Sequence, residues 1–272
     1  MNRRIVILVI IITAVIAAVF VSLKLYVVNK KNQEKNKKTT TVLSLAGQAL
    51  ALEEKGNLIE ARNLYQRLVN ESPDSANFLT LQKKIEGLNI RIIFSPIMTT
   101  KSKIYEIKPG DTLIKIASQF STTVELLMKS NNLSSDRIVP NKKIKINTET
   151  FSVFVDKSQN ILLLKSGEDV VKTYIVSTGA NNSSPVGNFK IVNKIVSPTW
   201  FKAGAVVAPG SPENVLGTRW MGIDAKGYGL HGTVEPQQLG KQVTEGCVRL
   251  ANSDVEELYD ILPVGTEVVI VD

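Results

Sequence analysis

Cysteine and histidine are almost absent from this sequence, which has one of each in 272 residues. A single cysteine excludes an internal disulfide, so packing alone must stabilise each folded part. One histidine and one cysteine are also a poor set of zinc ligands. The sequence therefore predicts no metal and no other cofactor.

Acidic residues are scarce in the first half of the chain. Residues 1–150 contain 23 lysines and arginines against 12 acidic residues, whereas residues 151–272 contain 10 against 13. The net charge of +8 thus belongs to the N-terminal part. This distribution argues against a nucleic-acid partner for the C-terminal part and predicts a basic stalk near an anionic surface or polymer.

One long uncharged run, Ile5 to Leu23, predicts a transmembrane anchor within residues 1–28. At ~1.5 Å per residue it matches the ~30 Å core of a bilayer. A cleaved signal peptide has a shorter apolar region and a small-residue cleavage motif, so we expect an uncleaved anchor. Five lysines lie in the polar, basic tether at 29–41, whereas two arginines precede the anchor. The positive-inside rule alone therefore favours a cytoplasmic location for the C-terminal side.

Residues 42–91 show helical periodicity. The pattern Gly-Asn-x-x-x-Ala-x-x-x-Tyr from Gly56, with Pro73 beyond, resembles one tetratricopeptide repeat. Gly56 is predicted to end the first helix, Asn57 to cap the second, and Ser72-Pro73 to open a third. One repeat does not easily bury its own face. We therefore expect either a protein-interaction segment or a plain three-helix stalk.

Residues 103–148 predict a strand, two short helices and a second strand, with strands at 104–107 and 144–146. Candidate helix caps are Asp111 or Thr112 for the first helix and Thr122 or Thr123 for the second.

This unit resembles a LysM module. The resemblance rests on the run Tyr105 to Leu113, with its Pro-Gly-Asp-Thr turn, and on Asn131-Asn132-Leu133 at the expected spacing. It implies binding to glycans that contain N-acetylglucosamine, such as the glycan strands of peptidoglycan. The alternative is a small domain that serves only as a spacer.

Strand-like patterns dominate residues 150–272. Hydrophobic residues alternate from Phe151 to Val155, and short apolar runs follow at 161–164 and 170–176. Ser253 and Glu256 form a capping-box pattern that opens one long helix. We expect a mostly β domain, a closed or sandwich-like sheet with that helix and a last strand near the C-terminus.

The single histidine and the single cysteine, His231 and Cys247, lie 16 positions apart in this domain. Each has a glycine beside it, where an apolar run gives way to a turn. A thiol becomes a good nucleophile when it loses its proton, which a nearby imidazole can accept. The pair predicts a nucleophilic Cys–His site. The alternative is a buried core cysteine and an unrelated histidine.

Four ordered segments of the domain, 184–189, 216–220, 228–233 and 244–250, resemble the YkuD-type L,D-transpeptidase domain. The resemblance implies that Cys247 is the nucleophile and His231 the base. Many members have Ser-His-Gly-Cys at the nucleophile. In this chain Thr244 keeps the hydroxyl and Glu245 replaces the second histidine. A carboxylate there can stabilise an imidazolium or raise the pKa of the thiol.

Further site residues are expected around this pair. Gly232 can offer its carbonyl to orient the imidazole, and the backbone near Gly246 can stabilise an oxyanion. Arg249 is a candidate binder of a stem carboxylate or a structural ion pair. Thr244 is expected either to bind substrate or to hold its loop. Trp220 is expected in the core rather than in the pocket wall.

The resemblance implies a two-step acyl transfer on peptidoglycan stem peptides, with a cysteine thioester and 3→3 cross-links as product. One alternative is an L,D-carboxypeptidase that trims tetrapeptide stems. Another is a membrane-anchored wall-binding scaffold without catalysis. Because peptidoglycan lies outside the membrane, residues 30–272 are expected on the extracytoplasmic side of the cell membrane, against the lysine count.

Overall fold

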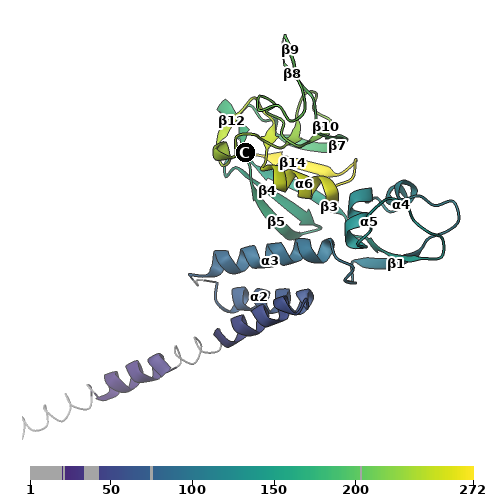
Figure 1. The fold of residues 1–272 in the computed structure, drawn as a ribbon. Coiled ribbons are helices and arrows are strands. Elements are labelled where there is room, and N and C mark those ends of the chain that lie inside the picture. Colours follow the sequence, from purple (N-terminus) through teal and green to yellow (C-terminus); the bar gives the residue numbers. More distant parts are fainter. Residues whose placement is uncertain (1–19, 21, 34–42, 74–75, 203) are drawn as a thin grey trace, which may run out of the picture. The chain divides into compact units, whose positions relative to one another are not determined.

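The computed structural model describes residues 20, 22–33, 43–73, 76–202 and 204–272. The chain divides into two compact units, Met1–Lys84 and Ile85–Asp272 (Figure 1). The predicted membrane segment, Ile5 to Leu23, lies almost wholly outside the described residues. Within the part that is described, residues 22–33 are helical, and no helix is long and apolar enough to cross a bilayer.

Three helical segments follow the tether. Residues 43–54 are helical, α2 spans Leu58–Glu71 and α3 spans Phe78–Ile93. Asn57 is the N-cap residue of α2, as predicted, but its side chain makes no capping hydrogen bond. The prediction that Ser72-Pro73 opens the third helix is wrong. Ser72 ends α2 instead, because its N–H bonds back to the carbonyl of Leu68.

The first unit buries the apolar side of α2. Ala61 and Leu68 are fully buried, and Tyr65 is nearly so. The Tyr65 hydroxyl donates to the carboxylate of Glu53 at 3.3 Å, and Lys84 pairs with the same carboxylate at 3.2 Å. These polar contacts connect the first helical segment to both of the following helices.

The LysM-like unit has the predicted order of elements. It consists of β1 (Ser102–Glu106), α4 (Leu113–Gln119), α5 (Val124–Ser130) and β2 (Lys143–Asn147). The two strands pair antiparallel. Thr112 and Thr123 are the caps, and their hydroxyls accept from the N–H groups of Lys115 and Leu126. Seven buried apolar side chains form the core, among them Leu113, Ile116, Leu127 and Ile146.

Two polar side chains of the resemblance are structural supports. Asn131 follows α5, donates to the carbonyl of Lys145 at 2.9 Å and accepts from the N–H of Lys145. Asp111 accepts from the Tyr105 hydroxyl at 2.9 Å and from the Lys108 N–H at 2.8 Å. These contacts fix the turn and the return of the chain into β2.

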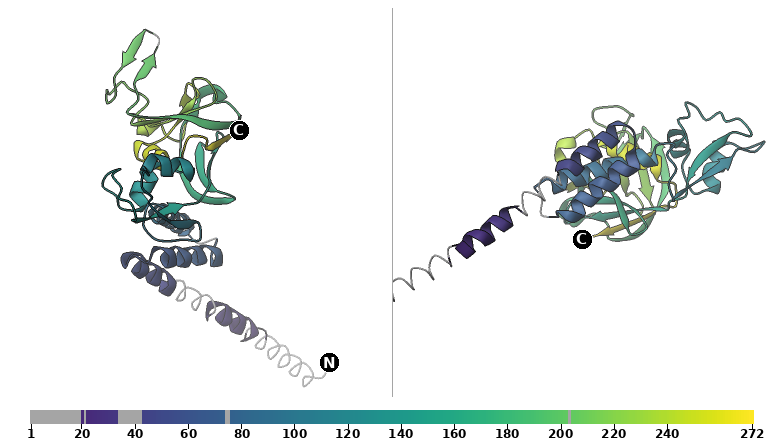
Figure 2. Two further views of the ribbon diagram at one scale, coloured as in Figure 1. Left: turned by 90° about the vertical axis from the view of Figure 1, so that its right-hand side faces the viewer. Right: turned by 90° about the horizontal axis from the view of Figure 1, so that it is seen from below.

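In the part of the chain that the structure describes, the C-terminal domain is built on an eight-stranded sheet. Its strand order is β13-β11-β10-β7-β14-β3-β4-β5 (Figure 1, Figure 2). The strands are β3 (Phe151–Asp156), β4 (Ile161–Ser166), β5 (Asp169–Ile175), β7 (Gly187–Val196), β10 (Arg219–Ile223), β11 (Gly229–His231), β13 (Val248–Arg249) and β14 (Glu267–Val271).

The two edges of this sheet meet at one point. Ser177, just beyond β5, exchanges two backbone hydrogen bonds of 2.8 Å with Arg249 of β13. The short strands β6 (Thr178–Gly179) and β12 (Gln242–Thr244) pair next to this bridge. The sheet therefore curves so that its two edges meet at β13. This strand also carries residues of the candidate site.

The helix α6 (Asn252–Ile261) packs on the sheet through Val255, Leu258 and Tyr259. It begins earlier than predicted, with Ala251 at its N-cap and no side-chain capping bond. The predicted capping box of Ser253 is therefore wrong. The side chain that works at this end is Asn252, which bonds to neighbouring loops instead of to its own helix.

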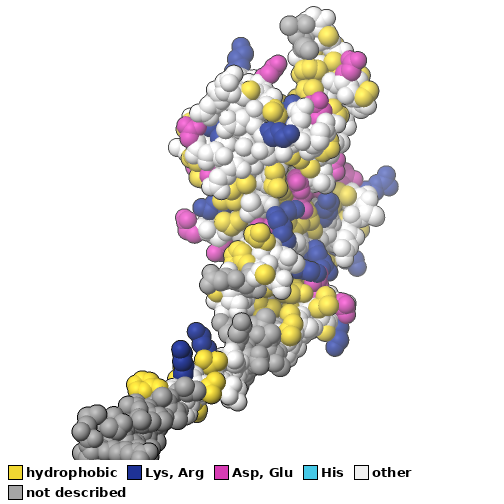
Figure 3. All heavy atoms as spheres, turned by 90° about the vertical axis from the view of Figure 1, so that its left-hand side faces the viewer, with side chains coloured by type: hydrophobic (Ala, Val, Ile, Leu, Met, Phe, Trp, Pro, Cys, Tyr) yellow, Lys and Arg dark blue, Asp and Glu magenta, His cyan; other side chains and the backbone are white. Residues whose placement is uncertain are grey.

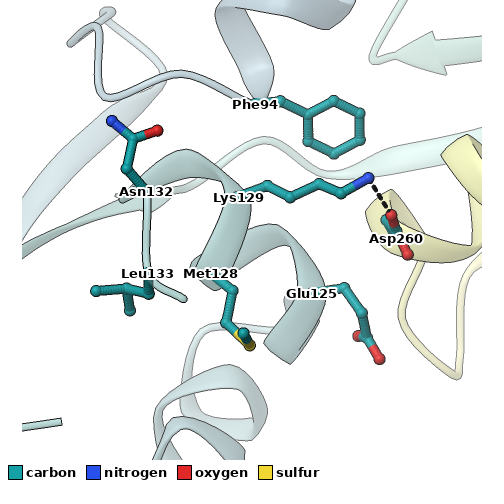
Figure 4. Close-up of a pocket in the computed structure, with 7 residues that line it drawn as sticks. All are labelled: Phe94, Glu125, Met128, Lys129, Asn132, Leu133 and Asp260. Atoms are coloured by element: carbon teal, nitrogen blue, oxygen red, sulfur yellow. Dashed lines mark ion pairs between the residues drawn. The ribbon is translucent and has the colours of Figure 1, made fainter. Parts of the chain in front are cut away.

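The LysM-like unit contacts the C-terminal domain within the second compact unit. The Thr123 hydroxyl donates to the carbonyl of Asp260 in α6, and Lys129 pairs with the Asp260 carboxylate. The Lys129 ammonium also lies 4.6 Å from the ring centre of Phe94. Figure 4 shows Phe94, Lys129 and Asp260 among the residues that line a cavity of about 460 Å³.

A hairpin of β8 (Trp200–Lys202) and β9 (Ala205–Val207) projects from the C-terminal domain. Its Phe201 and Val206 are largely exposed, and Figure 3 shows hydrophobic side chains along it. The short strands of 219–223, 229–231 and 248–249 that surround the candidate site lie in the main sheet, so the site does not depend on this hairpin for its backbone.

Candidate active site

Adjacent parallel strands bring the histidine and the cysteine together. In β11 and β13, Leu230 pairs with Val248 and His231 with Arg249. Cys247 immediately precedes β13, one residue before Val248. Because side chains alternate along strands, His231, Arg249 and Cys247 project on one face of the sheet. Two residues that are 16 positions apart in the sequence thus share one site.

The imidazole of His231 is held in one tautomer. Its Nδ1 lies 2.7 Å from the carbonyl oxygen of Gly232. A carbonyl oxygen only accepts, so Nδ1 carries the hydrogen and Nε2 keeps its lone pair. Gly232 is required here because a Cβ would lie 2.1 Å from the side-chain oxygen of Asn252. The free lone pair at Nε2 is the atom that can take a proton.

His231 is a neutral base in this environment. It is 3% exposed, and this burial lowers the pKa of His231 to about 4. The Gly232 carbonyl raises the pKa, whereas the nearby Arg249 cation lowers it further. At neutral pH the imidazole is therefore uncharged and able to accept a proton.

Cys247 is a protonated thiol in the resting site. Its Sγ lies 3.7 Å from the carbonyl of Gly227, to which the thiol donates. Burial raises the pKa of Cys247, whereas the Gly229 N–H and the Arg249 cation lower it and the Glu245 carboxylate raises it. The arrangement favours a neutral thiol beside a neutral imidazole, with proton transfer during attack.

Glu245 is exposed and acts on the thiol from a distance. Of the two effects that the sequence leaves open for this carboxylate, the electrostatics favour a raised pKa of Cys247. At position 245 the site thus has an acidic side chain, which disfavours ionisation of the thiol, in place of the histidine expected from the family resemblance.

The nucleophile loop is held by Thr244. Its hydroxyl accepts from the Gly246 N–H at 3.2 Å and donates to the Cys247 carbonyl at 2.7 Å. Thr244 is only 5% exposed, so its contacts favour the loop-holding role over substrate binding. Gly246 has φ +126°, and a Cβ there would lie 2.4 Å from the ring of Tyr228. Only glycine fits this position without displacement.

Arg249 is buried beside the pair. Its guanidinium donates to Gln238 at 2.8 Å and pairs with Glu235 at 3.3 Å. Among the described residues no hydrogen-bond partner is found for its Nε. One side of the guanidinium therefore makes a structural contact, and Nε keeps a buried, unused donor. The charge of Arg249 lowers the pKa of both His231 and Cys247.

Three neighbours of the site have contacts that the sequence did not predict. Trp220 was predicted in the core, and this prediction is wrong. Its ring stacks on His231 instead, with ring centres 5.9 Å apart. Asn252 bonds to the backbone of Thr218 and Thr233, next to Gly232. Ser184 bonds to the carbonyl of Gly246. Ser184 and Trp220 lie in two of the segments that carry the family resemblance. That position was the one sequence feature that could have indicated a place near the site.

Comparison with protein families identifies two regions. Residues 150–270 match the L,D-transpeptidase catalytic domain (YkuD), and residues 105–147 match the LysM domain. The chain is 34% identical over 173 residues to YkuD of Bacillus licheniformis, a protein named as an L,D-transpeptidase, across 61% of this chain and 96% of that one. It is 40% identical over 126 residues to YqjB of Bacillus subtilis, named likewise, across 44% and 70%.

Solved structures share a looser likeness. An L,D-transpeptidase from Mycobacterium smegmatis aligns with a TM-score of 0.39 and 17% identity, over 50% of this chain and 65% of that one. An L,D-transpeptidase from Mycobacterium tuberculosis aligns with a TM-score of 0.39 and 19% identity, over 49% and 63%. The chain thus spans just under two thirds of these solved chains.

Proposed function

The chain belongs to the YkuD family of L,D-transpeptidases, and we propose that it transfers acyl groups between peptidoglycan stem peptides through a thioester on Cys247. The observation that carries this proposal is the pairing of β11 with β13, which puts His231 and Cys247 on one face of the sheet. The locked tautomer of His231 supports its role as base.

In the first step the Cys247 thiol attacks the carbonyl of the third stem residue. A bond forms between Sγ and the carbonyl carbon, the thiol proton moves to Nε2 of His231, and the carbonyl oxygen becomes an oxyanion. The bond to the terminal D-Ala then breaks, and His231 returns the proton to the leaving amine. The products of this step are free D-Ala and a thioester.

In the second step a side-chain amine of a neighbouring stem attacks the thioester. His231 takes a proton from that amine, and the Cys247 sulfur leaves and regains a proton. The result is a 3→3 cross-link. The raised pKa of the thiol fits the end of this step, because the released sulfur returns to the protonated form of the resting enzyme.

Arg249 is proposed to bind a carboxylate of the stem peptide. A guanidinium suits a carboxylate, and its Nε lacks a partner among the described residues. The contacts to Gln238 and Glu235 would then hold the other nitrogen in place.

The LysM domain is proposed to hold the glycan strands that carry these stems. We propose further that Ile5 to Leu23 anchor the chain and that residues 30–272 lie on the extracytoplasmic side. A topology reporter fused after Thr150 tests this location. An extracytoplasmic signal is expected, and a cytoplasmic signal would contradict it.

The activity is tested by incubating the full chain with tetrapeptide stems and identifying the products by mass spectrometry. Cross-linked dimers and free D-Ala are expected from the wild type and neither from Cys247→Ala. Tripeptide and D-Ala without dimers would identify a carboxypeptidase instead. D-Ala release by Cys247→Ala would exclude the thioester mechanism.

Labelling by a carbapenem is an independent test of Cys247 as the nucleophile. We expect one acyl adduct on Cys247 and none on the Cys247→Ala protein, detected by intact mass. The absence of any adduct on the wild type would count against a competent nucleophile. A non-catalytic wall-binding scaffold would give neither adduct nor products.

A further inference from the structure

The peptide bond that precedes the nucleophile is held by a buried serine. Ser184 is 3% exposed and lies in the loop that follows β6. Its hydroxyl donates to the carbonyl of Gly246 at 2.8 Å and accepts from the N–H of Gly179 at 2.8 Å. A hydroxyl has a single hydrogen. Because Gly179 can only donate, that hydrogen is committed to the Gly246 carbonyl.

This bond determines where the N–H of Cys247 points. The carbonyl of Gly246 and the N–H of Cys247 belong to one planar trans peptide and point in opposite directions. With the carbonyl held against Ser184, the Cys247 N–H is directed away from the buried loop. Gly246 has no side chain to limit rotation of this peptide. The hydrogen bond to Ser184 therefore supplies the orientation.

The Cys247 N–H is also the available donor next to the nucleophile. The Gly246 N–H is already taken by the Thr244 hydroxyl at 3.2 Å. For the Cys247 N–H, the described residues provide no backbone acceptor. An N–H beside the attacking sulfur is well placed to stabilise an oxyanion, and such donors contribute about 10²- to 10³-fold in rate.

We propose that Ser184 is a positioning residue that aims the Cys247 N–H at the oxyanion during thioester formation. This inference rests on the proposed function, because it concerns the same acyl transfer. It assigns to Ser184 an effect on acylation and not on the reactivity of the thiol itself.

Ser184 is itself fixed by a buried lysine. Lys157 is 2% exposed, and its ammonium donates to the Ser184 carbonyl at 3.0 Å. The same ammonium pairs with the carboxylate of Asp272 at 3.0 Å. Gly179 allows close packing here, because a Cβ on it would lie 2.9 Å from the Gly246 Cα. The serine hydroxyl therefore has little freedom to leave its acceptor.

The test compares two reactions of the same thiol in the full chain. Alkylation by iodoacetamide displaces iodide and forms no oxyanion, whereas acylation by tetrapeptide stems or a carbapenem does. The variants are Ser184→Ala, Ser184→Thr and Ser184→Cys. Ser183→Ala is the matched control, since Ser183 is the exposed neighbour.

For Ser184→Ala we expect kcat for D-Ala release and the carbapenem acylation rate to fall about 10- to 100-fold, with KM little changed. The alkylation rate should stay within about twofold of wild type, since that reaction uses no oxyanion donor. Ser184→Thr should restore acylation and Ser184→Cys should fall between the two, because a thiol is a weaker donor. Ser183→Ala should behave as wild type.

Acylation and alkylation that fall by the same factor would overturn the proposal, as would an unchanged acylation rate in Ser184→Ala. Loss of the folded state in the Ala, Thr and Cys variants alike would also overturn it and make Ser184 a folding residue. Wild-type protein that releases no D-Ala and forms no adduct would instead refute the proposed function. The two failures are therefore distinguishable.

Discussion

The indole of Trp220 stacks on the imidazole of His231, with ring centres 5.9 Å apart and planes 20° from parallel. The two residues are cross-strand partners in the antiparallel pair of β10 and β11. The indole N–H donates to Asn193 at 3.1 Å, which fixes the ring. The tryptophan thereby covers one face of the catalytic candidate and keeps water from it.

This stacking predicts the titration of the histidine. Burial is the largest cause of the lowered pKa of His231, about 4 in the folded protein. Trp220→Ala should uncover the ring, and the pKa should rise toward its ordinary value of about 6.5. NMR titration reads this directly, because the chain has one histidine. Trp200→Ala is the control, and equal pKa values in both variants would contradict the role of Trp220.

The same lowered pKa predicts how stability depends on pH. In the unfolded chain His231 titrates near pH 6.5, and in the folded protein near pH 4. As pH falls, the unfolded state binds the proton first, so stability present above pH 6.5 is lost between pH 6.5 and 4. The loss is roughly 3 kcal/mol when complete.

Urea unfolding of wild type and His231→Gln at several pH values between 7 and 4 isolates this contribution from the carboxylates. The wild type should lose more stability on acidification than the variant. Parallel pH dependences in the two proteins would show that the imidazole is not buried in its neutral form.

Asn252 is predicted to matter for both folding and activity. Its side chain accepts from the N–H groups of Thr218 and Thr233 and donates to the Thr233 carbonyl at 2.9 Å. These bonds hold the loop whose Gly232 carbonyl orients His231. Asn252→Ala should lower the unfolding free energy by about 1–3 kcal/mol and kcat by about 10- to 100-fold.

Ser253→Ala is the matched control, because this neighbour is exposed. Both variants are compared by urea unfolding and by D-Ala release. If Asn252→Ala lost stability but kept the wild-type kcat, the loop would not orient the base.

Features of the chain that depend on near neighbours could be predicted from the sequence. Thr112 and Thr123 cap helices because each hydroxyl reaches an N–H three residues ahead. The strand from Phe151 to Val155 follows from simple alternation of burial. Local patterns therefore sufficed for the LysM unit and for β3, β4, β5 and β14, but not for the strands between residues 177 and 250.

Features that depend on distant residues could not be predicted in this way. Ser184 meets Gly246 across 62 positions of the chain, and no local pattern encodes that contact. Trp220 has a large, mostly apolar side chain of the kind that is common in cores. Its cross-strand register nevertheless puts it against His231. The start of α6 was misjudged for the same reason, since Asn252 bonds to other loops and not to its own helix.

Lys145 is predicted to stabilise the second compact unit. It is 2% exposed, and its ammonium donates to the carbonyls of Ile92 and Ser95 at the end of α3. Burial lowers the pKa of Lys145 to about 8. Lys145→Ala leaves these carbonyls without that donor and should cost about 1–3 kcal/mol in urea unfolding. Lys143→Ala, at the exposed first position of the same strand, should cost far less. Equal losses would contradict the buried role.

Glu245 is predicted to restrain the nucleophile. Its exposed carboxylate raises the pKa of Cys247, so Glu245→Gln should lower that pKa and speed alkylation by iodoacetamide at neutral pH. A screened surface charge should act severalfold at most, and the difference should shrink as salt shortens the Debye length below about 8 Å. Glu213→Gln, also exposed, should leave the rate unchanged.

Glu245→Lys extends this test, because it replaces the negative charge with a positive one. If the effect is electrostatic, the alkylation rate should rise from glutamate to glutamine to lysine, and high salt should bring the three rates together. A rate that changes with side-chain shape but not with charge would contradict this account. The carboxylate would then act through loop geometry, and burial would raise the pKa of Cys247 without a contribution from its charge.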